Sequence, residues 1–399
     1  MLKTDSQPWK TLVRAGLAAF SAILLFAPAA RAQDDWSTKW SNGFKVESAD
    51  GRFKLKFGGR LQADYTFVSA DDAFGGLEDG FEFRRARLFT SGTVYDRVEF
   101  KAQYNFTDGD ADIKDLYLGL LNDWGTVRFG HFKEPFSLEE LTSSKYLAFL
   151  ERSMPVEAFS PSRNSGVGAL GTAGDRVNWG VGVFYDADGF GVSTDEDATN
   201  VTGRVAFRPL HDEDGTRIVH LGVAASQQER DGTLRFRTRP EAHLSSRLVD
   251  TGSFPGDSVT LLGGEVAGVF GPLWFASEYI QADTDAPAVD DPTFDGAYAQ
   301  AGWFLTGESR AFKSSSGAFN RNKPKANYGQ GAGAWEVAVR YSTIDLTDGT
   351  VSGGEQSDIT AAVNWYLNPV TRLMLNFVRA DVDDAGEADF FLVRWQIDF

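Results

Sequence analysis

The last nine residues, Phe391-Leu-Val393-Arg-Trp395-Gln-Ile397-Asp-Phe399, place a bulky apolar side chain at every second position and end on an aromatic residue. An extended segment with this pattern has one apolar face and one mixed face. At the end of a soluble protein it would leave an apolar strand edge exposed, whereas a closed outer-membrane barrel needs a last strand that pairs with the first. The ending therefore favours an all-β, transmembrane antiparallel barrel over the alternative, a buried last strand in a soluble sandwich.

The amino terminus has the pattern of an export signal. Lys3, Lys10 and Arg14 precede an apolar run over residues 15–30, and Ala30-Arg-Ala32 supplies small residues for cleavage. The run is too short and too one-sided for a spanning helix, and no later segment offers about 18 consecutive apolar residues. We expect a signal peptide at residues 1–32 and one outer-membrane barrel domain at residues 33–399, because only a barrel then remains to cross the bilayer.

Composition excludes some partners and cofactors. The chain has 399 residues, 42 glycines, no cysteine and a formal net charge of −17. Nucleic-acid binding needs a basic surface, so we expect no nucleic-acid partner. Several connections are rich in aspartate, and we expect them to be solvated surface loops. The alternative is that they bind divalent cations, which would bridge them to lipid phosphates.

Short alternating segments, divided by turn residues, run through the chain. The clearest is 98–106, in which Glu99, Lys101, Gln103 and Asn105 alternate with apolar or aromatic residues. In a barrel the polar set faces the water-filled interior and the apolar set faces lipid. Similar patterns occupy residues 53–57, 60–67, 116–120, 177–183, 201–207, 219–225, 335–341, 361–367 and 373–377. At about 23 residues for a strand with its connections, the mature chain accommodates roughly 16 strands.

One connection departs from the pattern. The alternation lapses over residues 131–166, and the segment 137–152 has apolar residues near helical spacing, namely Leu138, Leu141, Tyr146, Phe149 and Leu150. A long loop with its own partial helix is usually functional, and in a porin such a loop folds inward and narrows the lumen. We expect a pore-constricting loop that contains a short helix. The alternative is a cap on the surface.

Arginines recur at close spacing in two segments, residues 84–87 and Arg235-Phe-Arg237-Thr-Arg239. In a strand, alternate positions stack guanidinium groups along one wall at about 7 Å intervals. Guanidinium groups fit phosphate oxygens, and the lipid face cannot host such a column. The spacing predicts a basic ladder for oxyanions. The alternative is a solvated stripe on a loop or rim with no selective role.

Motifs along nearly the whole mature chain resemble the phosphate-selective porins of the O/P type. They are Gly59-Arg-Leu-Gln-Ala-Asp64, Phe83-Arg-Arg-Ala-Arg87, Ile113-Lys-Asp-Leu-Tyr-Leu118, Gly130-His-Phe-Lys-Glu-Pro-Phe136, Thr142-Ser-Ser-Lys145, Arg237-Thr-Arg-Pro-Glu241, Gly302-Trp-Phe-Leu-Thr-Gly-Glu308, Gly333-Ala-Trp-Glu336 and Asn364-Trp-Tyr-Leu-Asn368. The resemblance implies a homotrimeric, 16-stranded barrel in outer-membrane lipid. It also implies that the third loop folds into the pore and that small anions, phosphate or related oxyanions, diffuse past a lysine at the constriction.

The resemblance further implies roles for single residues. Lys145 is similar to the constriction lysine, with Ser143 or Ser144 as a hydroxyl donor beside it. Arg60 and Arg85 are similar to the arginines that face this lysine from the barrel wall. These five residues are therefore the expected core of the anion site.

Asp115 is similar to the acidic residue that tempers the site, because an anion must bind strongly enough to enter and weakly enough to leave. The basic ladder would comprise Arg235, Arg237, Arg239, Arg87 and Arg152. Strong overall acidity departs from this pattern, since it repels polyanions at the mouth unless the local field is positive. A general or weakly selective porin for small solutes is thus the alternative function.

Enzymatic function finds little support in the motifs. The chain has no cysteine, no His-Glu-x-x-His, no phosphate-binding Gly-Lys-Ser/Thr loop and no Gly-x-Ser-x-Gly elbow. Its four histidines lack metal-ligand spacing, so we expect no metal and no cofactor. The remote alternative is a barrel hydrolase built around His220. A third class is a structural or receptor protein whose barrel is closed by its inner loop.

The carboxyl-terminal segment also predicts how the barrel closes. We expect it to pair with the first strand, around residues 53–57, with Phe399 at the periplasmic rim. The alternation places Arg394 on the lumen side, where it would join the basic lining.

Overall fold

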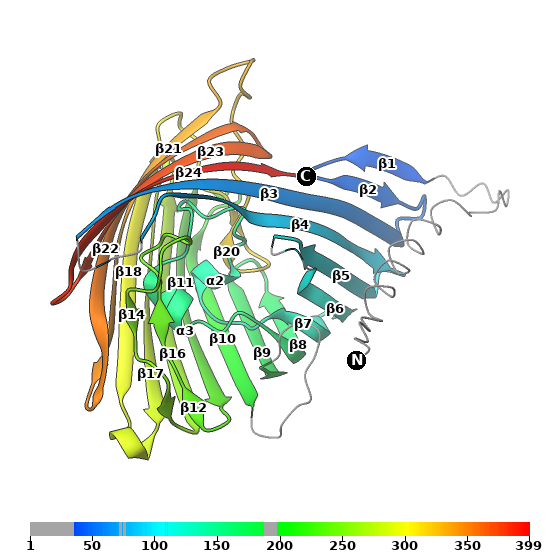
Figure 1. Ribbon diagram of the computed structural model, residues 1–399. Helices are drawn as coiled ribbons and strands as arrows, with labels where there is room; N and C mark the ends of the chain where they lie inside the picture. The colour runs from blue at the N-terminus through cyan, green and yellow to red at the C-terminus, as the bar shows by residue number, and fades with distance from the viewer. Residues whose placement is uncertain (1–35, 72–73, 75–76, 108, 110, 187–197) are drawn as a thin grey trace, which may run out of the picture.

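The chain folds into a closed barrel. In the computed structural model, residues 36–71, 74, 77–107, 109, 111–186 and 198–399 are described. The expected signal peptide, residues 1–32, lies outside the described residues. Sixteen antiparallel strands form the barrel, as predicted, and two short strands at the amino end join the same sheet (Figure 1).

The sixteen strands follow one another around the barrel in chain order. They are β3 (Phe53–Ala70), β4 (Gly80–Val94), β5 (Val98–Asn105), β6 (Asp112–Asn122), β7 (Gly125–Lys133), β8 (Arg163–Ala173), β9 (Val177–Tyr185), β10 (Thr199–His211), β11 (Arg217–Glu229), β16 (Ser258–Phe270), β17 (Leu273–Asp285), β18 (Thr293–Phe304), β21 (Ala334–Asp348), β22 (Val351–Asn368), β23 (Thr371–Val382) and β24 (Gly386–Asp398). Segments 53–57 and 60–67, expected as two strands, form one strand because Gly58 and Gly59 continue the extended backbone.

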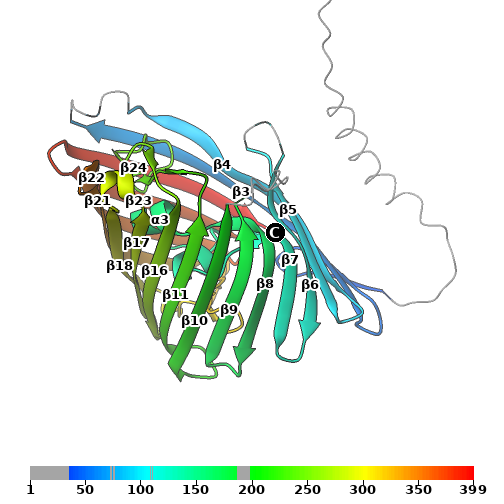
Figure 2. The same ribbon diagram turned by 90° about the horizontal axis from the view of Figure 1, so that it is seen from below.

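Side chains alternate between lipid and lumen along these strands. Leu118, Phe129 and Trp395 are more than half exposed on the outer face, whereas Arg394 and Gln396 are buried inside. Figure 2 shows β8 to β11 side by side along one wall. No helix in the described part of the chain is long and apolar enough to span a membrane.

The barrel closes where β24 pairs with β3. The last strand pairs with the first, as predicted, but the paired residues are 60–70 and not the expected 53–57, since Asp398 lies opposite Arg60. Because β24 ends opposite Arg60, residues 53–57 have no partner in that strand. They pair instead with β2 (Phe44–Glu47), which forms a hairpin with β1 (Ser37–Trp40). The ring of Phe399 stacks on Trp40, with 6.4 Å between centroids. The hairpin thus covers a strand edge that β24 is too short to reach.

Three long connections pack inside the barrel against one part of its wall. Residues 134–162 contain α2 (Leu138–Leu141) and α3 (Met154–Phe159); we call this segment the constriction loop. Residues 230–257 contain β12 (Thr233–Leu234), β13 (Arg237–Thr238), β14 (Val249–Asp250) and β15 (Phe254–Pro255). Residues 305–333 contain β19 (Phe312–Lys313) and β20 (Ala318–Phe319). A single-turn helix, η2 (Pro287–Val289), lies between β17 and β18. Apolar side chains of all three connections pack into one cluster with inward residues of β16 to β22.

The short helix expected in this loop covers little of the segment 137–152. Only Leu138–Leu141 is helical, although Phe149 and Leu150 are buried as their apolar spacing suggested. The carbonyls of residues 144–148 bond to side chains of the barrel wall and of the 305–333 connection. These bonds to partners far away in sequence stabilise the non-helical backbone of the segment.

Candidate functional site

The constriction loop crosses the lumen and leaves a passage on one side. Its start is fixed to β17, since the backbone N–H groups of Leu138 and Glu139 donate to the Glu278 carboxylate at 2.9 and 2.7 Å. The carboxylate of Glu139, in the same loop, lies 3.1 Å from the guanidinium of Arg340 on β21. Both contacts lie on the β16 to β22 side of the barrel. The open space therefore remains along β4 to β10.

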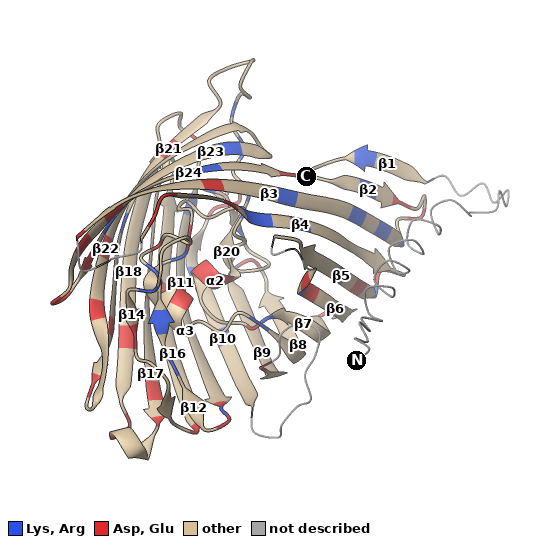
Figure 3. Ribbon diagram, viewed as in Figure 1, with Lys and Arg blue, Asp and Glu red and all other residues tan. Residues whose placement is uncertain are grey.

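This open space is a cavity of about 980 Å³ with a strongly basic lining. Four acidic side chains line it, namely Glu99, Asp112, Asp115 and Glu140. Twelve basic side chains line it, namely Arg60, Arg84, Arg85, Arg87, Lys101, Lys114, Arg128, Lys133, Arg152, Arg163, Arg204 and Lys313. Basic residues band β3 and β4, while acidic residues band β17 across the barrel (Figure 3). An acidic chain thus encloses a basic passage.

A second cavity of about 690 Å³ continues toward the β1–β2 hairpin. Lys39, Lys45, Lys54 and Lys56 line it, on the face of the hairpin and of β3 opposite their aromatic residues. The two cavities share several lining residues, including Arg60, Lys101, Ser143 and Lys313. They therefore meet where the constriction loop faces β3 and β5.

Two of the predicted constriction residues, Arg60 and Ser143, lie at this junction. Ser143 lines both cavities, and Arg60 donates from Nη1 to Ser144 Oγ at 2.6 Å. Within the described part of the chain, no carboxylate oxygen lies within 4.0 Å of the Arg60 guanidinium. Arg60 thus offers a charge without a paired carboxylate where the two cavities meet.

Lys145 lies just beyond the junction, in the lining of the second cavity. Its Nζ is 3.4 Å from Asp398 Oδ2 and sits over the rings of Phe89 and Tyr146, 5.7 and 5.4 Å from their centroids. Burial, reinforced by nearby cations such as Arg60, lowers the pKa of Lys145 to about 7. The protonation of this lysine, and so its charge, therefore changes with pH near neutrality.

Asp115 neutralises part of the passage. Its carboxylate binds Lys101 Nζ at 2.7 Å and Arg163 Nε at 3.1 Å. Two residues of the predicted ladder lie here: Arg87 donates to Asn105 at 3.4 Å, and Arg152 pairs with Glu140 at 2.9 Å. All of these side chains except Asn105 line the larger cavity.

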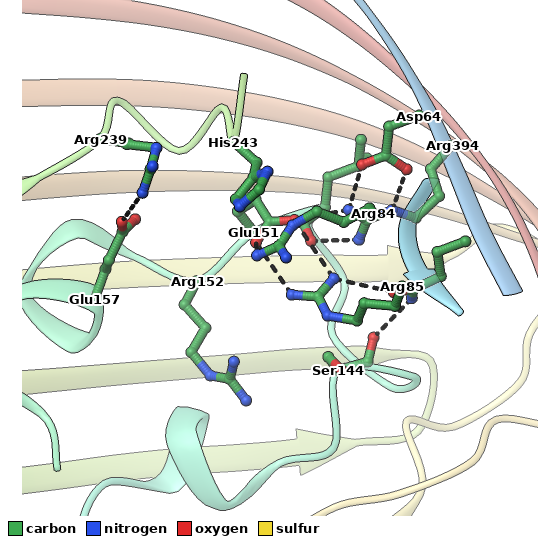
Figure 4. A network of polar contacts seen from close by, with 12 residues as sticks. Asp64, Arg84, Arg85, Ser144, Glu151, Arg152, Glu157, Arg239, His243 and Arg394 are labelled. Carbon is green, nitrogen blue, oxygen red and sulfur yellow. Dashed lines mark hydrogen bonds and ion pairs between the residues drawn. The ribbon is translucent and has the colours of Figure 1, made fainter. Parts of the chain in front are cut away.

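Arg85 belongs to a network that ties the loop to the wall (Figure 4). The Glu151 carboxylate accepts from Arg84 at 2.8 Å, Arg85 at 3.2 Å and Arg394 at 2.7 Å. Burial alone would raise the pKa of Glu151, but these arginines outweigh it and hold the pKa well below its usual value. Arg394, which also binds Asp64, faces inward as expected but is fully buried under the loop. The prediction that Arg394 joins the basic lining of the pore is therefore wrong.

Arg235, Arg237 and Arg239 lie outside any barrel strand. They belong to the 230–257 connection, where Arg235 is exposed and pairs with Asp250 at 2.7 Å. Arg239 pairs with Glu157 on α3 at 3.1 Å. None of the three is among the described residues that line the two cavities. The prediction that these three arginines form a ladder along one strand is therefore wrong. The segment forms only two-residue strands within a long connection, as in the alternative of a stripe on a loop.

Several lining residues were not anticipated as site residues. Arg128 alternates with the outward residues Val127 and Phe129, so the period of two would have found it. Arg163 begins β8 directly after the constriction loop. Lys313 lies in the 305–333 connection, where no periodic pattern indicates which way a side chain points.

His220 offers no support for hydrolase chemistry. It is fully buried, and its Nε2 lies 2.7 Å from Glu265 beside Arg204. In the described residues, no group of three or more histidine, aspartate or glutamate side chains is arranged to hold a metal ion.

Comparison with known proteins assigns the family. The chain is 30% identical to Porin O of Pseudomonas aeruginosa over 416 residues, covering 90% of this chain and 92% of that protein. It is 31% identical to an uncharacterized protein of Caulobacter vibrioides over 397 residues, covering 93% and 79%. Its fold is similar to the trimer form of OmpT of Vibrio cholerae (TM-score 0.57, 13% identity, 87% and 99% covered) and to Salmonella typhi OmpF (0.56, 11%, 91% and 100%). The model of the family "Phosphate-selective porin O and P" matches residues 55–399, and the chain belongs to this family of bacterial outer-membrane porins.

Proposed function

We propose that this porin conducts small anions, phosphate or related oxyanions, by passive diffusion along the basic passage beside the constriction loop. The observation that carries the proposal is the lining of twelve basic against four acidic side chains in a chain of net charge −17. A lining of one sign inside low-dielectric walls concentrates ions of the other sign.

In the proposed pathway, anions meet Arg60, Ser143, Ser144 and Lys145 in succession at the narrowing. Arg60 and the serine hydroxyls can replace part of the hydration shell of an oxyanion. Asp115 keeps binding weak enough for release by neutralising its two cationic neighbours. Arg85, bound to Glu151, contributes mainly to the positive potential.

The proposed assembly is a homotrimer embedded in outer-membrane lipid. The family resemblance supports it, and OmpT, whose fold is similar, is described in a trimer form. Native gel mobility and mass measurement of the detergent-solubilised protein test this part independently of conduction.

Recording from the protein in planar bilayers tests the function. In a salt gradient the reversal potential should indicate anions over cations, and millimolar phosphate should reduce the chloride current. Lys145→Glu should diminish both effects, whereas Lys45→Glu, in the β1–β2 hairpin that lines the second cavity, should change them less. Current without anion preference would favour a general porin instead, and the absence of any current would contradict a channel.

A further inference from the structure

The middle of the constriction loop is held by its backbone. Seven of the eight carbonyls from Ser144 to Glu151 accept a hydrogen bond from a side chain outside the loop, over distances of 2.5–3.2 Å. The pairs are Gln62 to Ser144, Gln396 to Lys145, Arg310 to Tyr146, Arg372 to Leu147, Asn364 to Ala148, Arg394 to Leu150 and Arg340 to Glu151. We call these seven donors the carbonyl clamp.

The donors come from distant parts of the chain. Five strands, β3, β21, β22, β23 and β24, supply six of them, and the 305–333 connection supplies Arg310. All seven are at most 3% exposed, and their side chains point into the barrel interior. The eighth carbonyl is that of Phe149, whose ring lies under the Arg340 guanidinium, 4.4 Å from its centroid. A loop segment bonded at nearly every residue to a rigid wall has little freedom to move.

We propose that the carbonyl clamp fixes the width of the passage, with Arg372 and Asn364 as positioning residues that the permeating solute does not touch. Neither is among the described residues that line the two cavities. They bind the loop two and three residues after Lys145, at Leu147 and Ala148, so they set the position of this lysine and of the serines before it. The inference concerns the loop's position and does not depend on which solute permeates.

Arg372 is the cleanest place to test the clamp. Within the described part of the chain no carboxylate lies within 4.0 Å of it, so Arg372→Met leaves no buried anion without its partner. Its second acceptor, Gln396 Oε1, keeps the bond from Gln62 at 2.6 Å. Arg379→Met is the matched control, because Arg379 lies on the outer face of the same strand and pairs with Asp389.

The measurement is open-channel current noise and single-channel conductance in bilayers. We expect Arg372→Met to raise the noise at least severalfold and to broaden the conductance distribution, while Arg379→Met matches the wild type. Arg372→Lys retains a donor and should restore most of the quiet current. The reversal potential, which tests anion preference, is recorded on the same channels, so failure of the two proposals can be told apart.

Asn364→Leu is the second variant, in case Arg372→Met does not fold. It removes the bond to Ala148, while Glu336 keeps its bonds from Trp274, Arg310 and Tyr366. Added noise in a folded barrel would support the clamp. Quiet channels in Arg372→Met or Asn364→Leu, or equal noise in Arg379→Met, would overturn it.

Discussion

Lys145 is the residue whose charge should respond to pH at the constriction. Burial brings its pKa down to about 7, so the side chain is protonated below that pH and loses its charge as pH rises through it. We expect the ratio of chloride to potassium permeability to fall by roughly twofold to fivefold between pH 6 and pH 8.5. The ratio is obtained from the reversal potential in a potassium chloride gradient. Chloride is the suitable probe because it does not titrate in this range.

Two substitutions at the same position separate Lys145 from other groups. Lys145→Arg stays charged throughout and should give a selectivity that does not change with pH. Lys145→Met should be less selective at every pH and equally insensitive to it. A pH dependence that survives in Lys145→Met would assign the titration to another residue.

Asp115 should govern how quickly an anion leaves. Asp115→Asn frees Lys101 and Arg163 from their shared carboxylate and removes one negative charge from the lining. We expect sulfate to block the chloride current roughly fivefold more strongly, which corresponds to about 1 kcal/mol. Asp112→Asn, on the same strand, should change block little because its pair with Lys114 is more exposed and screened by salt. Equal effects of the two variants would contradict a special role for Asp115.

Among the elements, strands were more predictable than loops. A strand such as 98–105 alternates because one face meets lipid and the other meets water, and this demand is local. The conformation of the constriction loop depends on partners far away in sequence, such as Arg372 and Asn364. Its apolar spacing therefore indicated that the segment is buried but did not indicate its conformation. Arg394 shows the same limit, since its inward direction follows from alternation while the loop that covers it does not.

The β1–β2 hairpin should stabilise the closure of the barrel. Gly43 in its turn has φ +124°, and an added Cβ would lie 2.6 Å from the carbonyl oxygen of Phe57 and 3.2 Å from Phe399. We expect Gly43→Ala to destabilise the folded barrel by about 1–3 kcal/mol through this strain. Unfolding in urea, followed by the gel mobility of unheated samples, measures the change.

Gly203→Ala is the control for the hairpin variant. Gly203 lies in β10 away from the closure, and the nearest atom to an added Cβ is 3.7 Å away. This change should leave the urea midpoint nearly unaltered. If Gly43→Ala were as stable as Gly203→Ala, the hairpin would have no part in closing the barrel.

On the scale of the whole molecule, net charge and pore charge have opposite signs. The total of −17 follows from composition, but the basic passage depends on which side chains the barrel turns inward and which connections fill its other half. Alternation located Lys101 in advance, whereas Lys313 and Arg163 needed the folded connections. Some acidic residues lie on the outer face, for example Asp295, which lies opposite Asp345 on the next strand. Others, such as Glu278, are buried in the half of the barrel that the connections occupy.

This segregation predicts how selectivity depends on salt. The Debye length is about 10 Å at 0.1 M salt and about 3 Å at 1 M, so outer charges act on entering anions only in dilute salt. Asp345 and Glu355 lie opposite each other on the outer faces of β21 and β22. The double variant Asp345→Asn/Glu355→Gln should therefore raise anion selectivity modestly at 0.1 M and leave it unchanged at 1 M. Lys145→Met should lower selectivity at both concentrations, because its site is largely shielded from bulk salt. Reversal potentials measured at the two salt concentrations test this prediction. If the double variant still changed anion selectivity at 1 M, these carboxylates would act on the passage itself.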